Sequence, residues 1–175
     1  SLFTPRGVAN VKAVRELTPL PESREELQSL ARPLNAGYGS LMVGPDATET
    51  KVKAAPLSDY QVVAFATHGL VAGELAGVSE PALVLTPPAE ETETDDGLLT
   101  ASEVAQLKLN ADWIILSACN TAAADGTPGA RGLSGLAKAF FYAGSRAVLV
   151  SHCPMISDAA VAFTTRMLAV AKAPS

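Results

Sequence analysis

Three long apolar runs dominate the hydrophobic pattern of the chain. They are YQVVAFATHG at 60–69, ADWIILSAC at 111–119 and SRAVLVSHC at 145–153. Each run is too continuous to have a solvent-facing side, which is typical of the buried central strands of a parallel sheet. Two shorter apolar runs, GSLMVG at 39–44 and ALVLT at 82–86, also predict strands.

Segments with helical periodicity lie between these runs. In the first, Leu27, Leu30, Ala31 and Leu34 follow Pro21 at helical spacing and predict a surface helix. Other helical patterns begin after a cap at Asp46 or Thr48, after a cap at Thr100 or Ser102, and at Gly132, the last ending at Gly144. The alternation of strands and helices predicts an α/β fold with helices on both faces of a mostly parallel sheet. The acidic stretch at 87–97 predicts a mobile loop or a hairpin tip.

Composition limits the classes of protein to consider. A chain of 175 residues, 48% of them hydrophobic, is the size of one domain, so we expect residues 1–175 to form a single unit. The net charge of −5 and the scattered basic residues argue against nucleic-acid binding. No apolar run is long enough to span a membrane, and two cysteines make no disulfide framework, so a cytoplasmic protein is expected. Because the chain starts at Ser1, we expect it to be a fragment of a longer protein.

The chemically reactive side chains stand where the three long runs end. Ligands and reacting groups gather beyond the carboxyl ends of parallel strands. His68 and Gly69 end the first run, Cys119 ends the second, and His152 and Cys153 end the third. A thiol nucleophile needs a base such as imidazole, and a tetrahedral intermediate needs backbone N–H donors. Cys119 and His68 are therefore the candidate catalytic dyad, with the N–H groups of Gly69 and Cys119 as the candidate oxyanion hole.

Two alternative interpretations accompany this one. A single cysteine at the end of a buried strand is usually a small core residue. The two histidines and two cysteines also resemble a zinc-ligand set, but the adjacent His152 and Cys153 would point to opposite faces of a strand. We therefore expect neither a metal site nor any other cofactor.

Several sequence blocks resemble the CHAT domain, a bacterial relative of caspases and separases often found behind tetratricopeptide repeats. The blocks are VVAFATHG, PALVLTP, DDGLLTASEVAQLKLNADWIILSACNT and GLSGLAKAFFYAGSRAVLVSHCPM. The resemblance implies a three-layer αβα, caspase-like fold and a cysteine endopeptidase acting on a peptide or protein substrate. It assigns the histidine of the family's HG motif to His68 and the nucleophile of its SAC motif to Cys119. A tetratricopeptide-repeat domain in the parent chain is the implied partner.

The sequence departs from the family pattern around the substrate pocket. Cys153 stands where CHAT sequences usually have tryptophan. Metacaspases, more distant relatives, have an acidic residue two positions before the nucleophile to hold a basic substrate side chain, and here that residue is Ser117. A preference for Arg or Lys is therefore not indicated, although Asp95, Asp96 or Asp125 could supply charge from a loop.

The candidate pocket residues are thus Ser117, Asp125, His152 and Cys153. His152 is equally well explained as a strand-end histidine with ordinary partners. Two functions remain open at this point. The preferred one is a caspase-like cysteine endopeptidase with a Cys-His dyad, regulated by a partner or by the neighbouring repeat domain. The alternative is a catalytically silent CHAT domain that serves as an interaction or signalling module.

Overall fold

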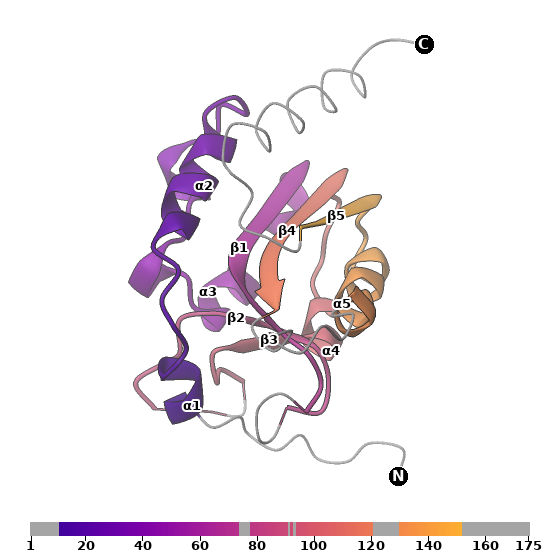
Figure 1. Cartoon of the computed structure of the whole chain (residues 1–175). Helices are drawn as coiled ribbons and strands as arrows, with labels where there is room; N and C mark the ends of the chain where they lie inside the picture. Colours follow the sequence, from indigo (N-terminus) through magenta and orange to yellow (C-terminus); the bar gives the residue numbers. More distant parts are fainter. Residues whose placement is uncertain (1–10, 74–77, 91, 93, 121–129, 152–175) are drawn as a thin grey trace.

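The computed structural model describes residues 11–73, 78–90, 92, 94–120 and 130–151. Within these residues, five strands form one sheet in the order β3-β2-β1-β4-β5 (Figure 1). The strands are β1 (Val62–Leu70), β2 (Ala82–Val84), β3 (Leu98–Thr100), β4 (Trp113–Asn120) and β5 (Ala147–Ser151). The helices are α1 (Val11–Arg15), α2 (Glu22–Ala31), α3 (Glu49–Ala54), α4 (Ala101–Val104) and α5 (Ala130–Tyr142). Short 3-10 turns lie at Tyr38–Ser40, Gly44–Asp46 and Leu57–Asp59.

The three long apolar runs form the parallel part of the sheet, as predicted. β1 pairs in parallel with β4, and β4 pairs in parallel with β5. β2 and β3 are short and antiparallel, and β2 joins β1 only through Gly69 and Leu70. The sequence did not predict β3, because the strand has only three residues and its last one, Thr100, is also the N-cap in the capping box of α4.

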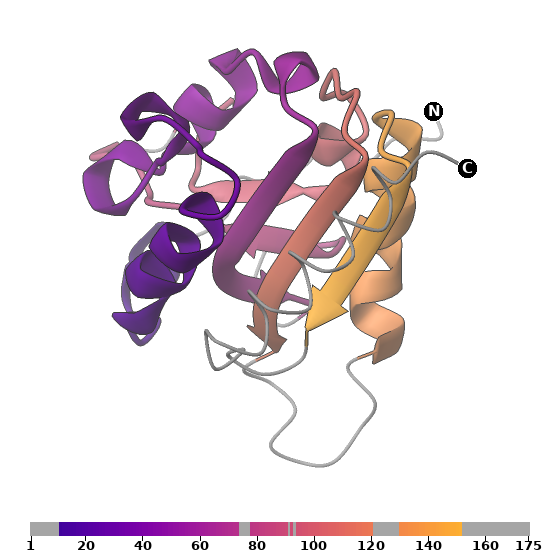
Figure 2. The same ribbon diagram turned by 90° about the horizontal axis from the view of Figure 1, so that it is seen from above.

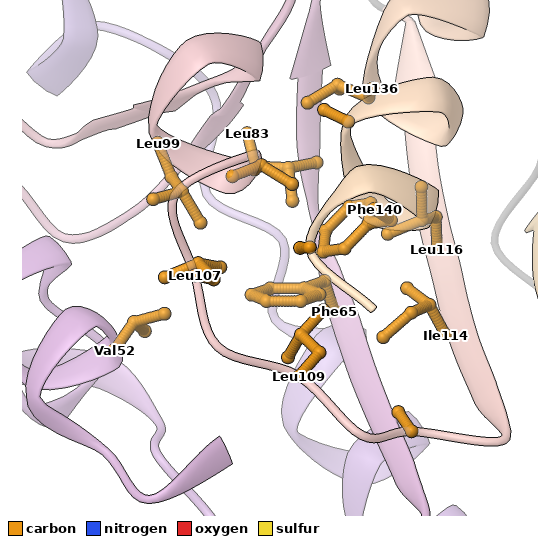
Figure 3. Packing of buried hydrophobic residues seen from close by; sticks show 14 of the residues in the cluster. Val52, Phe65, Leu83, Leu99, Leu107, Leu109, Ile114, Leu116, Leu136 and Phe140 are labelled. Atoms are coloured by element: carbon orange, nitrogen blue, oxygen red, sulfur yellow. The ribbon is translucent and has the colours of Figure 1, made fainter. Parts of the chain in front are cut away.

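The main core lies between one face of the sheet and α5. Phe65 of β1 and Leu116 of β4 are paired neighbours on this face, and both pack against the helix. The ring of Phe65 lies 5.6 Å from that of Phe140 on α5, at a tilted angle (Figure 3). Because Leu136 and Phe140 are four residues apart, they point from the same side of α5 into this cluster.

Helix α2 covers the opposite face of the sheet. Figure 2 shows α2, in purple, and α5, in orange, on the two sides of the strands. The predicted helix after Pro21 is confirmed, and its apolar Leu30 is buried. Glu26, one turn earlier, is buried as well, which a surface helix would not require. The three-layer αβα architecture predicted from the alternation of elements is therefore present.

The strand predicted at 39–44 is wrong. These residues form a 3-10 turn and extended backbone that enters a second 3-10 turn. A strand needs a neighbour to hydrogen-bond with. Residues 39–44 pair with none of the described strands, and β1 from Val62 to His68 pairs with β4 alone. The helix predicted to follow is confirmed as α3, whose N-cap is Thr48 accepting from the N–H of Lys51.

The acidic stretch before β3 is anchored at its end rather than free. Glu49 of α3 is fully buried, and its carboxylate accepts hydrogen bonds from the N–H groups of Asp96 (3.0 Å) and Gly97 (3.2 Å). Lys53 links Glu49 to Glu103 of α4. The stretch lies between the antiparallel strands β2 and β3, so the predicted hairpin is confirmed, and a distant buried acid holds the backbone at its end.

Truncation of Phe140 tests the core. Phe140 is fully buried, whereas its neighbour Phe141 is half exposed. Phe140→Ala should lower the free energy of unfolding by about 3–5 kcal/mol, because it removes a large side chain and leaves a cavity. Urea denaturation measures the difference. Phe141→Ala is the matched control and should cost well under half as much; equal losses would contradict the proposed packing.

Glu49 should make stability depend on pH. Burial raises the pKa of Glu49 from 4.5 to about 7, against the lowering effect of Lys53. The folded protein thus binds this proton more tightly than the unfolded chain does. The stabilisation is complete below pH 4.5 and is lost as the pH rises through 7, by up to about 3 kcal/mol.

Urea denaturation at pH 5 and pH 8 tests this dependence. Glu49→Gln should abolish part of the fall in stability between the two pH values, because glutamine has no proton to lose. Glu25→Gln, on the exposed side of α2, is the control and should keep the wild-type pH dependence. An unchanged pH dependence in Glu49→Gln would show that Glu49 does not carry the effect.

Candidate active site

The parallel pairing of β1 with β4 defines the candidate site. In this register the Cα of His68 lies opposite that of Cys119, and Gly69 lies opposite Asn120. Because both strands run in the same direction, their carboxyl ends meet at one edge of the sheet. The residues that the sequence predicted as a dyad are therefore direct neighbours on adjacent strands. The structure describes Cys119 by its place in β4 and by this pairing.

His68 is held by a segment that the sequence analysis did not identify. Its ring is buried, and Nε2 lies 2.7 Å from the carbonyl oxygen of Thr18, in the connection between α1 and α2. A carbonyl can only accept, so Nε2 carries the proton. The other ring nitrogen, Nδ1, is buried and has no hydrogen-bond partner among the described residues. The interaction of Thr18 left no sequence signal because it is made by the backbone.

A second polar contact lies on β4 close to Cys119. Ser117, a predicted pocket residue, is buried and hydrogen-bonds through its side chain to the carboxyl group of Glu26 on α2. Burial raises the pKa of Glu26, and the hydrogen bond from Ser117 offsets part of this rise. The sequence analysis missed Glu26 because helical periodicity marked α2 as a surface helix.

A cavity of about 760 Å³ extends along the side of β1 that faces away from β4. It is lined by α2, by residues 39–44 and by β1 from Val62 to His68. Thr18 and His68 both contribute to the lining, so the cavity reaches the histidine of the candidate site. Its walls include apolar side chains of α2 such as Leu27 and Leu30.

The remaining predicted site residues are distributed differently. Gly69 is buried within β1, next to His68. Asp125, His152 and Cys153 lie outside the described residues. Asp95 and Asp96 precede β3, which β2 and β1 separate from β4, and Asp95 hydrogen-bonds with Thr50. A contribution of these two aspartates to the charge of the pocket stays a prediction.

In the part of the chain that the structure describes, no group of three or more His, Cys, Asp or Glu side chains is arranged to hold a metal ion. Within the same residues, no helix is both long enough and apolar enough to cross a membrane.

The sheet order and the helices on both faces define a three-layer α/β protein with a caspase-like fold. Comparison with protein-family models gives a match to the CHAT domain over residues 7–173, nearly the whole chain. The protein therefore belongs to the CHAT domain family, in agreement with the resemblance found in its sequence motifs. A search of curated proteins found no match.

The contact with Thr18 predicts the tautomer of His68. In the neutral ring, the proton should reside on Nε2 because that nitrogen donates to the Thr18 carbonyl. Nitrogen-15 NMR of histidine-labelled protein distinguishes the two tautomers. The chain has only one other histidine, so His152→Gln assigns the signals. A neutral His68 with its proton on Nδ1 would contradict the hydrogen bond described above.

Proposed function

We propose that this CHAT domain is a cysteine endopeptidase in which Cys119 is the nucleophile and His68 is the general acid and base. The observation that supports this most strongly is the hydrogen bonding of the two ring nitrogens of His68. With Nε2 occupied by the Thr18 carbonyl, the buried Nδ1 is left as an acceptor without a partner among the described residues. A buried acceptor of this kind usually has a donor, and the neighbouring strand offers a thiol in register.

The strand register supports the same assignment. Residues that lie opposite each other on parallel strands project from the same face of the sheet. The pairing of His68 with Cys119 therefore favours proton transfer between thiol and imidazole. The Thr18 carbonyl orients the imidazole and stabilises the imidazolium ion that forms when the thiol loses its proton.

The proposed reaction has two steps. In the first, the thiolate of Cys119 attacks the carbonyl carbon of a peptide bond, and a tetrahedral intermediate forms. The imidazolium of His68 then gives its proton to the leaving amine as the C–N bond breaks, leaving a thioester. In the second step His68 takes a proton from water, the hydroxide attacks the thioester, and the thiol and a carboxylic acid are released.

Backbone donors complete the proposed site. The negative oxygen of the tetrahedral intermediate needs N–H groups already in position, and such donors contribute roughly 3–4 kcal/mol to transition-state stabilisation. The N–H groups of Gly69 and Cys119 are the candidates, since both residues lie at the carboxyl ends of the paired strands. Glycine at position 69 has no side chain to hinder a substrate carbonyl that approaches its N–H group.

Covalent labelling tests this function. A peptidyl acyloxymethyl ketone reacts with an activated thiolate, forming a C–S bond as its carboxylate leaves. We expect it to modify Cys119 rather than Cys153, as measured by mass spectrometry of digested protein. His68→Ala should slow labelling by about 100-fold or more, because general base catalysis typically contributes that much.

Two controls make the result interpretable. Cys153→Ala should be labelled like the wild type, and Cys119→Ala should not be labelled at all. Circular dichroism checks that His68→Ala is folded. If both cysteines react slowly and at similar rates in the wild type, the protein is not a peptidase of this kind, and the alternative of a silent interaction module is favoured.

A further inference from the structure

Glu26 occupies a position where the fold by itself favours an apolar side chain. It lies four residues before Leu30, so both residues belong to the same face of α2, the face toward the sheet. Glu26 is 8% exposed and Leu30 is 5% exposed. The adjacent Glu25 is exposed, as expected for an acidic residue on the solvent side of a helix. A leucine at position 26 would continue the apolar face without burying a charge.

Burial of this carboxyl group is only partly compensated in the described structure. Its side-chain hydrogen bond is with the hydroxyl of Ser117. The ion pairs found among the described residues do not include Glu26. A buried carboxylate is costly unless a cation or several donors accompany it, and a single hydroxyl provides much less. The raised pKa of Glu26 has the same cause, since desolvation disfavours its charged form.

The Glu26–Ser117 pair lies next to the candidate dyad. Ser117 precedes Cys119 by two residues on β4, a separation of about 6.6 Å along an extended strand. On β1, Ala66 lies opposite Ser117 and His68 lies opposite Cys119. The Glu26 carboxyl group therefore stands beside Ser117, one strand repeat before the dyad.

We propose that Glu26, together with Ser117, binds the cationic side chain of the substrate residue whose carbonyl Cys119 attacks, so that the peptidase cleaves after lysine or arginine. This inference rests on the proposed function and specifies its substrate class. The flexible four-carbon stem of lysine is comparable in length to the roughly 6.6 Å that separate Ser117 from Cys119 along the strand. The bound cation supplies the partner that the buried carboxylate needs, through charge-assisted hydrogen bonds.

This assignment changes the interpretation of Ser117. Taken alone, a serine two positions before the nucleophile gives no reason to expect a basic substrate. In the folded chain, the acidic group comes instead from α2, 91 positions earlier in the sequence (117 − 26), and reaches the strand through the serine hydroxyl.

Matched electrophilic probes test the proposal on the complete chain. Three peptidyl acyloxymethyl ketones differ only in the residue next to the ketone, which is lysine, arginine or norleucine. Norleucine has a straight apolar side chain of similar length to lysine without the charge. The wild type should label at Cys119 roughly 10- to 100-fold faster with lysine or arginine than with norleucine, the range expected for a hydrogen-bonded charge. A ratio near one would overturn the proposal without any variant.

Variants identify the group responsible. In Glu26→Gln, the ratio of lysine to norleucine labelling should fall to near one, and Glu26→Asp should restore part of it. Glu25→Gln is the matched control, one residue away on the exposed side, and should keep the wild-type ratio. A purely structural role of Glu26 would slow all three probes equally, leave the ratio unchanged and overturn the proposal.

The same experiment separates this inference from the proposed function. If norleucine and lysine probes both label Cys119 quickly and equally, the peptidase function stands and the specificity does not. If no probe labels Cys119 faster than Cys153, the peptidase function fails, and the proposal fails with it.

Discussion

The parallel register between β1 and β4 is the constraint on which the candidate site depends. Eight residue pairs, from Val62 opposite Trp113 to Gly69 opposite Asn120, fix this register. A shift by one residue would move every side chain of a strand to the other face of the sheet. If β1 slipped in this way, Phe65 would turn away from α5, and His68 would no longer lie opposite Cys119. The same apolar packing that stabilises the sheet thus keeps the two residues in line.

One face of the sheet is apolar and forms the main core, whereas the other face carries polar side chains. The face toward α5 is filled with bulky apolar side chains, including Phe65, Leu116 and Phe140, and it supplies the main core. The face toward α2 carries His68 and Ser117, and these are contacted by a backbone carbonyl and by Glu26. Burial of such polar groups weakens the packing of that layer relative to an apolar interface. The apolar core on the α5 side compensates for this loss of stability on the α2 side.

Much of the fold was predictable because continuous apolar runs and helical periodicity are local signals. β1, β4, β5 and α2 were all found in this way. The strand predicted at 39–44 failed because strand formation depends on a partner, and hydrophobicity alone does not report one. His68 and Cys119 stand at strand ends and could be proposed from sequence. Thr18 could not, because its contact uses a main-chain oxygen, and Glu26 could not, because adjacent acids on α2 look alike until the helix is docked.

The two buried glutamates, Glu49 and Glu26, differ in the number of partners that compensate their burial, and this difference separates a structural role from a binding role. Burial raises the pKa of both Glu49 and Glu26. Glu49 receives two backbone N–H groups and Lys53, and these contacts join α3 to the segment before β3. Such a carboxylate needs nothing further and is explained by the fold. Glu26 has the Ser117 hydroxyl and, among the described residues, no cation, although it lies beside the proposed dyad. A cationic substrate side chain is the partner that would complete it.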